Sequence, residues 1–142
     1  MSSLFVKNPE LKKLYEKGLE VRKQVMGKEY VEKALREATD FNRELQEIVT
    51  IFAWGLLWTR DEVIPRKIRS LINIGILSAL NRHNELKLHI KGAIRNGCTE
   101  EEIKEVLLQV AIYCGLPAAM DSFRIAQEAL REIKEEEKLK SS

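Results

Sequence analysis

The sequence predicts an all-α protein, a single domain of about six helices that spans residues 1–142. Apolar residues recur at helical spacing along most of the chain, and no segment alternates as a strand would. Helix start and stop signals divide the chain into segments of helical length. Hydrophobic residues make up 44% and charged residues 32% of the 142 residues, enough for one folded, soluble domain with its own core.

The N-terminal third carries signals for three helical segments. Asn8 is a cap residue followed by proline and glutamate, so a helix begins there, and Gly27 ends it. A short segment, 28–37, follows. Asp40 is expected to cap a long helix over 41–58. Its apolar residues at core spacing are Phe41, Leu45, Ile48, Ile51 and Phe52.

The central helix follows the connector 59–65 and runs to about Leu80. From residue 71 onward it is apolar almost all round, which predicts a buried helix. Four residues of this helix, spaced by four, three and four positions, lie along one side of it. Polar residues in such a stripe on a buried helix need hydrogen-bond partners or line a cavity. The stripe consists of Arg66, Ser70, Asn73 and Leu77.

Three further signals define the C-terminal part. Asn84 can cap a helix that Gly97 closes. Thr99 with a glutamate three residues later forms a capping box for a helix to about residue 114. Pro117 begins the last helix, whose charged end, 132–142, is expected to fray.

Composition excludes several classes of function. The formal net charge is +2, from 24 basic and 22 acidic residues, so neither nucleic acid nor a membrane is an expected partner. The first 13 residues lack the apolar segment of a secretory signal, and we expect a cytoplasmic protein. The two cysteines, Cys98 and Cys114, lie in no metal-binding or C-x-x-C spacing, so we expect reduced thiols and no metal site.

The helix over 84–96 holds the candidate chemistry. At 100° per residue, Glu85 and His89 lie one turn apart at the edge of the apolar face, with Gly92 leaving space beside them. A carboxylate in that place is expected to hold an imidazolium and raise its pKa. The alternative is that His89 is a packing or helix-contact residue. His83, in the preceding turn, is a further binding candidate or simply a solvated side chain.

A family resemblance is carried by three stretches in order: RSLINIGILSALNR, ELKLHIKGAIRNG and TEEEIKEVLLQVAIYCGLPAAMDSFR. With them, residues 54–130 closely resemble the carboxymuconolactone decarboxylase family, a distant relative of alkylhydroperoxidase D. The resemblance implies an alkylhydroperoxidase-D-like helical bundle and a ring-like homo-oligomer, commonly a hexamer. It also implies one of two activities, cofactor-free decarboxylation or thiol-dependent, peroxiredoxin-like reduction of hydroperoxides.

The thiol branch uses a C-x-x-C pair, a histidine four residues later and an upstream glutamate. If His89 matches that histidine, Arg82 and Glu85 stand at the cysteine positions and the glutamate falls near Ser70. The thiol chemistry therefore lacks its nucleophile. The sequence is more similar to the decarboxylase branch, which converts 4-carboxymuconolactone to 3-oxoadipate enol-lactone in the breakdown of aromatic compounds.

Decarboxylation of such a substrate needs carboxylate binding, stabilisation of charge on the carbonyl oxygen and return of a proton to carbon. We assign the proton to His89, oriented by Glu85, with no cofactor. An arginine is the natural carboxylate clamp, and Arg66 is the first choice. The other candidate binding residues are Arg69, Ser70, Asn73, Arg82 and His83. A related small lactone or carboxylate as substrate, and a non-catalytic helical oligomer, remain alternatives.

Overall fold

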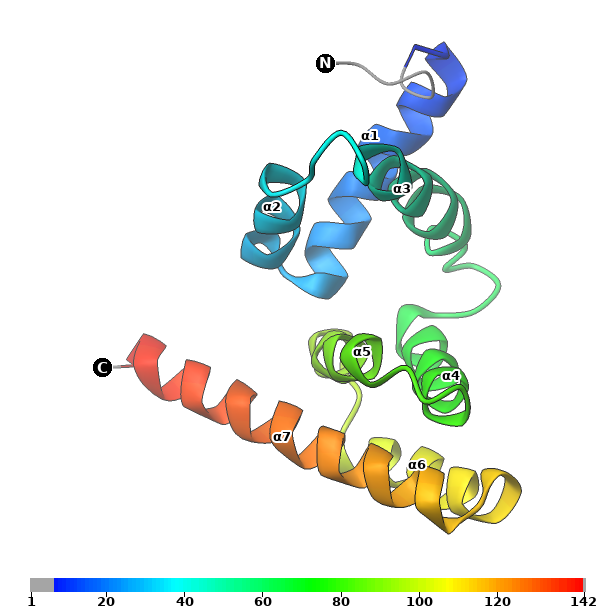
Figure 1. The fold of residues 1–142 in the computed structure, drawn as a ribbon, viewed down its shortest axis with the longest axis vertical. Helices are drawn as coiled ribbons and strands as arrows, with labels where there is room; N and C mark the ends of the chain where they lie inside the picture. The colour runs from blue at the N-terminus through cyan, green and yellow to red at the C-terminus, as the bar shows by residue number, and fades with distance from the viewer. Residues whose placement is uncertain (1–6, 142) are drawn as a thin grey trace. The chain divides into compact units, whose positions relative to one another are not determined.

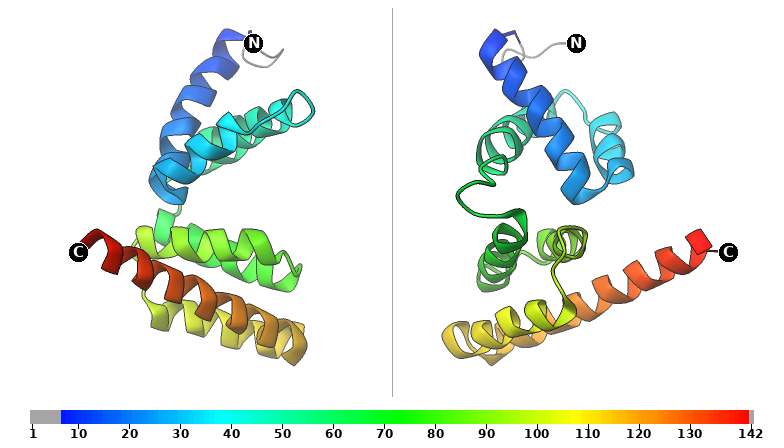
Figure 2. Two further views of the ribbon diagram at one scale, coloured as in Figure 1. Left: turned by 60° about the vertical axis from the view of Figure 1, so that its left-hand side comes forward. Right: turned by 180° about the vertical axis from the view of Figure 1, so that it is seen from behind.

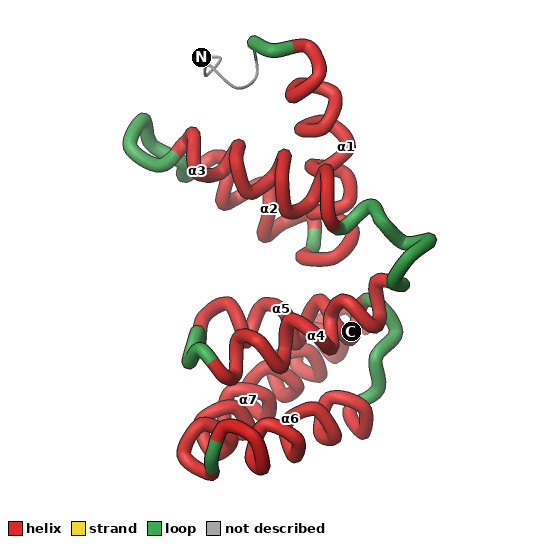
Figure 3. The backbone as a smooth tube through the Cα atoms, turned by 90° about the vertical axis from the view of Figure 1, so that its right-hand side faces the viewer, coloured by secondary structure: helices red, strands yellow, loops and turns green. Residues whose placement is uncertain are grey.

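The computed structural model describes residues 7–141, which form seven α-helices and one π-helix without a strand (Figures 1 and 3). The all-α prediction is confirmed. The chain divides into two compact units, Met1–Arg66 and Lys67–Ser142, each described by itself below. That both belong to a single domain stays a prediction. The cytoplasmic location was predicted from the first 13 residues, of which residues 1–6 lie outside the described residues.

The first unit contains α1 (Pro9–Met26), α2 (Lys28–Arg36), α3 (Arg43–Ile48) and the π-helix η1 (Val49–Leu57). The predicted cap of α1 is confirmed, because the Asn8 side chain accepts hydrogen bonds from the backbone N–H groups of Glu10 and Leu11. Gly27 ends α1 with φ of 97°, a conformation that glycine adopts without strain. None of the helices within residues 7–141 is long and apolar enough to cross a membrane.

The predicted helix over 41–58 differs from the structure in two ways. Asp40 is not its cap: the side chain forms an ion pair with Arg43 at 3.1 Å, and α3 begins after Asn42. From Val49 onward the helix is a π-helix, so the backbone N–H of Trp58 bonds the carbonyl of Ala53, five residues back. Such i→i+5 pairing is rare over nine residues and rotates the side chains away from their α-helical positions.

The predicted core face of 41–58 is mostly wrong. Ile51 is fully buried, but Phe41 is 97% exposed and Leu45, Ile48 and Phe52 are exposed as well. The buried residues of this segment are Glu47, Thr50, Ile51, Trp54, Gly55 and Trp58. The two tryptophan rings are buried in the core and stack with centroids 4.9 Å apart.

The packing of α1 against η1 depends on two glycines. A Cβ atom on Gly18 would overlap the carbonyl oxygen of Thr50 and lie 2.6 Å from the backbone nitrogen of Gly55. A Cβ on Gly55 would overlap the carbonyl oxygen of Leu14. The two helices therefore approach backbone to backbone. Beside this crossing, the buried Arg22 donates to Thr50 Oγ1 at 3.1 Å and to Gln46 Oε1 at 2.9 Å.

The second unit consists of α4 (Arg66–Ala79, entered from the first unit), α5 (His83–Arg95), α6 (Glu100–Cys114) and α7 (Leu116–Ser141) (Figure 2). The capping box at Thr99 is confirmed, with Glu102 bonding back to the cap. All four helices contribute to one apolar core. Its buried members are Ile74, Leu86, Ile90, Ala93, Cys98, Ile103, Leu107, Ile125, Ala126 and Ala129.

The predicted frayed end is wrong, because α7 stays helical to Ser141. Its acidic residues face α5. Lys87 lies 2.8 Å from Glu132 and 3.4 Å from Glu128, and Lys91 lies 3.3 Å from Glu132 and 3.5 Å from Glu136. Several charges sharing partners in this way form a network that supports the helix beyond the apolar core.

The α4 helix is less buried than its apolar sequence predicted. Ile74 and Ser78 are buried, but Ile72, Ile76 and Leu80 expose about half of their surface. A helix that is apolar all round thus presents one side to the core, and another side is not covered by any residue of 7–141.

Replacing Gly18 with alanine tests the helix crossing. The added methyl group would force α1 and η1 apart, and we expect a loss of about 2–3 kcal/mol in the free energy of unfolding, measured by chemical denaturation. Gly75→Ala is the control, because a Cβ there meets only Val106 Cγ1 at 3.7 Å. That variant should gain about 0.5–1 kcal/mol from helix propensity. Equal stabilities of the two variants would contradict the crossing.

Candidate active site

The candidate site lies on the hairpin of α4 and α5, which run antiparallel because a turn of only a few residues connects them (Figure 2). Near the far end of the hairpin, Asn96 Nδ2 donates to Ser70 Oγ at 2.8 Å. This bond joins the end of α5 to the first turns of α4. It places the polar stripe of α4 at the level of the second half of α5, where Gly92 and Ala93 are buried.

His89 is half-buried on α5, and its environment opposes the protonated form. Burial lowers the pKa of His89 to about 4 from its ordinary value of 6.5, while the charge of Glu85 acts in the opposite direction and is the smaller effect. The expected imidazolium with a raised pKa is therefore wrong for the unliganded protein. At neutral pH His89 is a neutral imidazole, able to accept a proton when a negative charge arrives.

Glu85 lies one turn before His89 in the first turn of α5 and is exposed. Its charge acts on the imidazole, as its spacing predicted. A carboxylate at a helix N-terminus is also stabilised by the helix dipole, so its place is favourable without any catalytic role.

The structure separates the two arginines considered first for carboxylate binding. Arg66 is occupied, since its Nη1 donates to Gln24 Oε1 at 2.8 Å and its Nε lies 3.5 Å from Asp61 Oδ2. Arg69 is only 9% exposed. Among the described residues it has no ion pair, and its Nε atom has no hydrogen-bond partner. A buried guanidinium without an anion favours Arg69 over Arg66 as the clamp.

The remaining predicted residues divide into two groups. Ser70 is buried and Asn73 half-buried on α4, so both stay candidates. Arg82 is exposed just before α5. The Nε2 atom of His83 lies 3.8 Å from Asp121 Oδ2 of α7, a contact on the α7 side of the hairpin. The structure therefore offers no support for Arg82 and His83 in the site.

The thiols show no arrangement for redox catalysis. Both cysteines are free. Cys98 is buried, its Sγ donates to the Lys67 carbonyl at 3.3 Å, and burial raises its pKa, so the reactive thiolate is disfavoured. Cys114 is exposed at the end of α6. Neither lies on α5, where the thiol branch of the family would place its pair.

One residue of the hairpin was missed by the sequence-based choice of site residues. Asn96 shares the stripe of Glu85 and His89 on α5, which was the available signal. Its contact with Ser70 could not be predicted, because it depends on how α4 and α5 pair.

These features define a class of protein: a small, all-helical protein with a half-buried histidine on one helix and, on the neighbouring helix, a buried arginine that has no ion pair among the described residues. The chain belongs to the carboxymuconolactone decarboxylase family, whose profile matches residues 43–128. The match crosses the boundary between the two compact units. The family resemblance noted from the sequence is confirmed.

Relatives with assigned reactions cover most of the chain. It is 44% identical over 127 residues to the nitrosuccinic acid decarboxylase of Metarhizium robertsii, a match covering 89% of this chain and 88% of the relative. It is 40% identical over 119 residues to the 4-carboxymuconolactone decarboxylase of Acinetobacter baylyi, covering 84% and 88%. A 4-carboxymuconolactone decarboxylase of Pseudomonas putida matches over 44 residues at 41% identity, covering 31% of this chain and 92% of that relative.

The depressed pKa of His89 has a consequence for stability. Between pH 6.5 and about 4 the unfolded chain binds a proton at His89 that the folded protein does not bind. The wild type should therefore lose stability as the pH falls through this window, by up to about 3 kcal/mol relative to His89→Gln. Denaturation curves of both proteins at a series of pH values measure this. A difference that is constant from pH 7 to 4 would contradict the burial of the imidazole.

Proposed function

We propose that the chain is a carboxy-lyase that removes carbon dioxide from a small dicarboxylic acid, with Arg69 binding a carboxylate and His89 and Glu85 as an acid–base pair. Carboxy-lyase activity is the class named for relatives that are 44% and 40% identical over most of their length. The observation that carries the assignment of the site is the buried guanidinium of Arg69, which lacks an anion among the described residues.

The chemistry of the two relatives' substrates defines the class. Nitrosuccinic acid and 4-carboxymuconolactone each contain two carboxyl groups and an electron acceptor, a nitro group in one and an unsaturated lactone in the other. In each, the electrons left by carbon dioxide can move into the acceptor. A substrate with its own electron sink needs no cofactor, so we propose that this chain uses none. We expect 4-carboxymuconolactone, nitrosuccinate or a related acid to be turned over.

Arg69 suits the binding of such a dianion. A buried guanidinium costs free energy unless an anion accompanies it, and a planar carboxylate can accept two parallel N–H···O bonds from it. A bound carboxylate would supply the missing partner of the Nε atom. Ser70 and Asn73 on the same helix are further donors for the substrate.

The neutral state of His89 fits the proton balance of the reaction. Loss of carbon dioxide from a carboxylate followed by protonation of carbon consumes one proton per turnover. A dianionic substrate favours the imidazolium, and Glu85 acts in the same direction, so His89 can take up a proton with the substrate and return it to carbon. Glu85 therefore favours protonated His89 when the substrate is bound, although the effect of burial on the pKa is the larger one when the substrate is absent.

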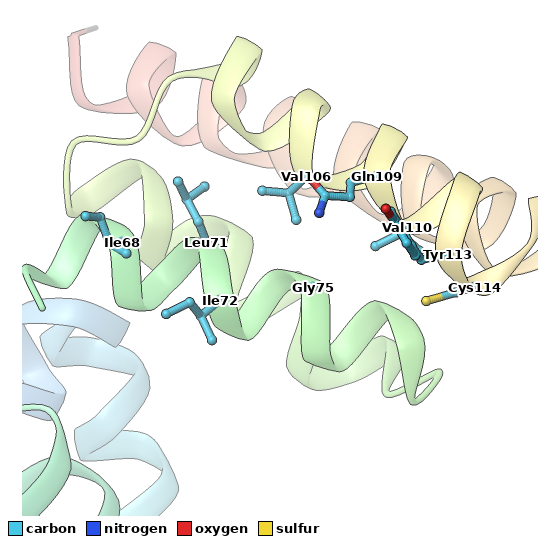
Figure 4. Close-up of a pocket in the computed structure, with 9 residues that line it drawn as sticks. All are labelled: Ile68, Leu71, Ile72, Gly75, Val106, Gln109, Val110, Tyr113 and Cys114. Carbon is cyan, nitrogen blue, oxygen red and sulfur yellow. The ribbon is translucent and has the colours of Figure 1, made fainter.

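We also propose that the protein is a homo-oligomer, a hexamer as the family resemblance implies, working in the cytoplasm. Unpartnered apolar surface in the second unit supports this. An apolar groove of about 340 Å³ runs between α4 and α6, lined by Leu71, Ile72 and Val106 among others (Figure 4). At the end of α6, Ile112 and Tyr113 are 80% and 81% exposed.

Light scattering tests the oligomer. We expect a mass that is a multiple of the 16.4 kDa chain, near six chains, and a smaller species for Ile112→Glu, because a buried unpaired charge opposes association. Ser141→Glu, which adds the same single negative charge at an exposed position, is the matched control. A wild-type monomer would refute the proposal.

The function is tested by release of carbon dioxide from 4-carboxymuconolactone and from nitrosuccinate. We expect turnover of at least one of them by the wild type. His89→Ala should lower kcat by at least about a hundredfold, since it removes the proton donor, with the oligomer unchanged.

Arg69→Gln should raise KM by about tenfold or more, because it removes the charged partner of a carboxylate. Arg124→Gln removes an equal charge from an exposed position and should behave as the wild type. Full activity of His89→Ala would exclude the assigned proton donor, and an unchanged KM in Arg69→Gln would exclude the clamp.

A further inference from the structure

Ser70 is a buried hydroxyl whose hydrogen bonds can be counted. Its side chain is 1% exposed, and its Oγ accepts the hydrogen bond from Asn96 Nδ2 at 2.8 Å. A hydroxyl has one hydrogen to donate and two lone pairs. Since Asn96 supplies the hydrogen of this bond, the hydrogen of Ser70 itself must point elsewhere.

Two other hydroxyls in the chain show where such a hydrogen ordinarily goes. Thr50 and Thr59 donate to the carbonyl four residues back, at 2.7 Å and 2.9 Å. Ser70 makes no such bond within the described part of the chain, and its burial keeps bulk water away. A buried donor without an acceptor is costly, so the Ser70 hydroxyl is suited to an acceptor that none of the described residues provides.

The Ser70–Asn96 pair lies in the candidate site. Asn96 follows His89 by seven residues, which is 20° short of two full turns, so both lie on one face of α5 about 10 Å apart along the axis. Ser70 directly follows Arg69, whose buried Nε also has no partner among the described residues. Two buried donors of α4, Arg69 Nε and the Ser70 hydroxyl, thus have no acceptor among the described residues, and a carboxylate can accept hydrogen bonds from both kinds of group.

We propose that Asn96 is a positioning residue: by donating to Ser70 Oγ, it directs the Ser70 hydrogen to a substrate carboxylate. This inference rests on the proposed function and adds a residue to it. Asn96 does not touch the substrate. Without its N–H, the Ser70 hydroxyl can rotate and donate back along α4 as Thr50 does in its own helix, and the substrate loses one hydrogen bond.

The direction of this hydrogen bond can be reversed experimentally. Asn96→Asp keeps the size of the side chain but replaces the N–H donor by an acceptor, so the Ser70 hydrogen turns toward Asp and away from the substrate. We expect KM to rise about tenfold and kcat to change less than about twofold, because a carboxylate contact persists from the bound substrate to the transition state. Asn96→Ala, which adds no charge, should raise KM about threefold. The affinity for succinate, measured by calorimetry, should fall by the same factors.

Three controls separate positioning from damage to the fold. Melting temperatures of the variants report stability. Asn42→Asp makes the same chemical change at a turn of the first unit, where the Asn42 Oδ1 atom that accepts from the Thr39 N–H is retained. Ser70→Ala should raise KM as Asn96→Asp does, and in the Ser70→Ala background Asn96→Asp should have no further effect, as expected for residues that act through one another.

The outcomes distinguish this inference from the proposed function. An unchanged KM in Asn96→Asp, or an equal rise in the Ser70→Ala background, would overturn the positioning role while decarboxylation stood. A wild type that binds succinate but turns over none of the acids would refute the proposed function, and the succinate affinities would still decide the role of Asn96. A wild type that turns over none of the acids and does not bind succinate would overturn both.

Discussion

The free-energy cost of burying a charge without a counter-charge governs the candidate site. Two arginines of this chain are buried, and they differ in how that cost is met. Arg22 in the first unit is held by Thr50 and Gln46, so its polar hydrogens are used within the fold. Arg69 in the second unit has no such partners among the described residues. Removing an ion from water costs several kcal/mol, and an anionic ligand would offset it. In the proposed function, a substrate carboxylate bound at Arg69 would supply this missing partner.

One side of α5 forms ion pairs with α7, and the opposite side carries His89. Lys87 and Lys91 lie on the opposite side of the helix from His89, and their acidic partners on α7 hold that side in place. The rotation of α5 about its axis is thereby fixed, and with it the direction of the imidazole. Single ion pairs at a surface contribute little, but pairs that share Glu132 restrain one another. The charged end of α7 belongs to this structure, which is why it remains helical.

Features that depend on residues close together in the sequence could be predicted, and features that depend on tertiary contacts could not. The caps at Asn8 and Thr99 could be predicted, because they involve residues two or three positions apart. The π-helix could not, since no local signal indicates i→i+5 bonds. The face predicted around Phe41 and Leu45 was wrong because tertiary packing buries another side of this segment. The i,i+4 spacing gave the sign of the effect of Glu85 on His89. It could not reveal that burial, a property of tertiary packing, outweighs it. The choice between Arg66 and Arg69 as the candidate carboxylate-binding residue likewise depended on their contacts in the folded protein.

The backbone contact of α1 with η1 also constrains how this sequence can diverge. A side chain on Gly18 would meet the main chain of Thr50 and Gly55, and a side chain on Gly55 would meet the main chain of Leu14, so neither glycine can be enlarged. A second substitution cannot compensate, because the atoms in the way belong to the main chain and not to a side chain that could be replaced by a smaller one. A relative with a larger residue at either position must hold its first helix farther away. The pair therefore offers a two-residue marker for sorting relatives by the geometry of their N-terminal helices.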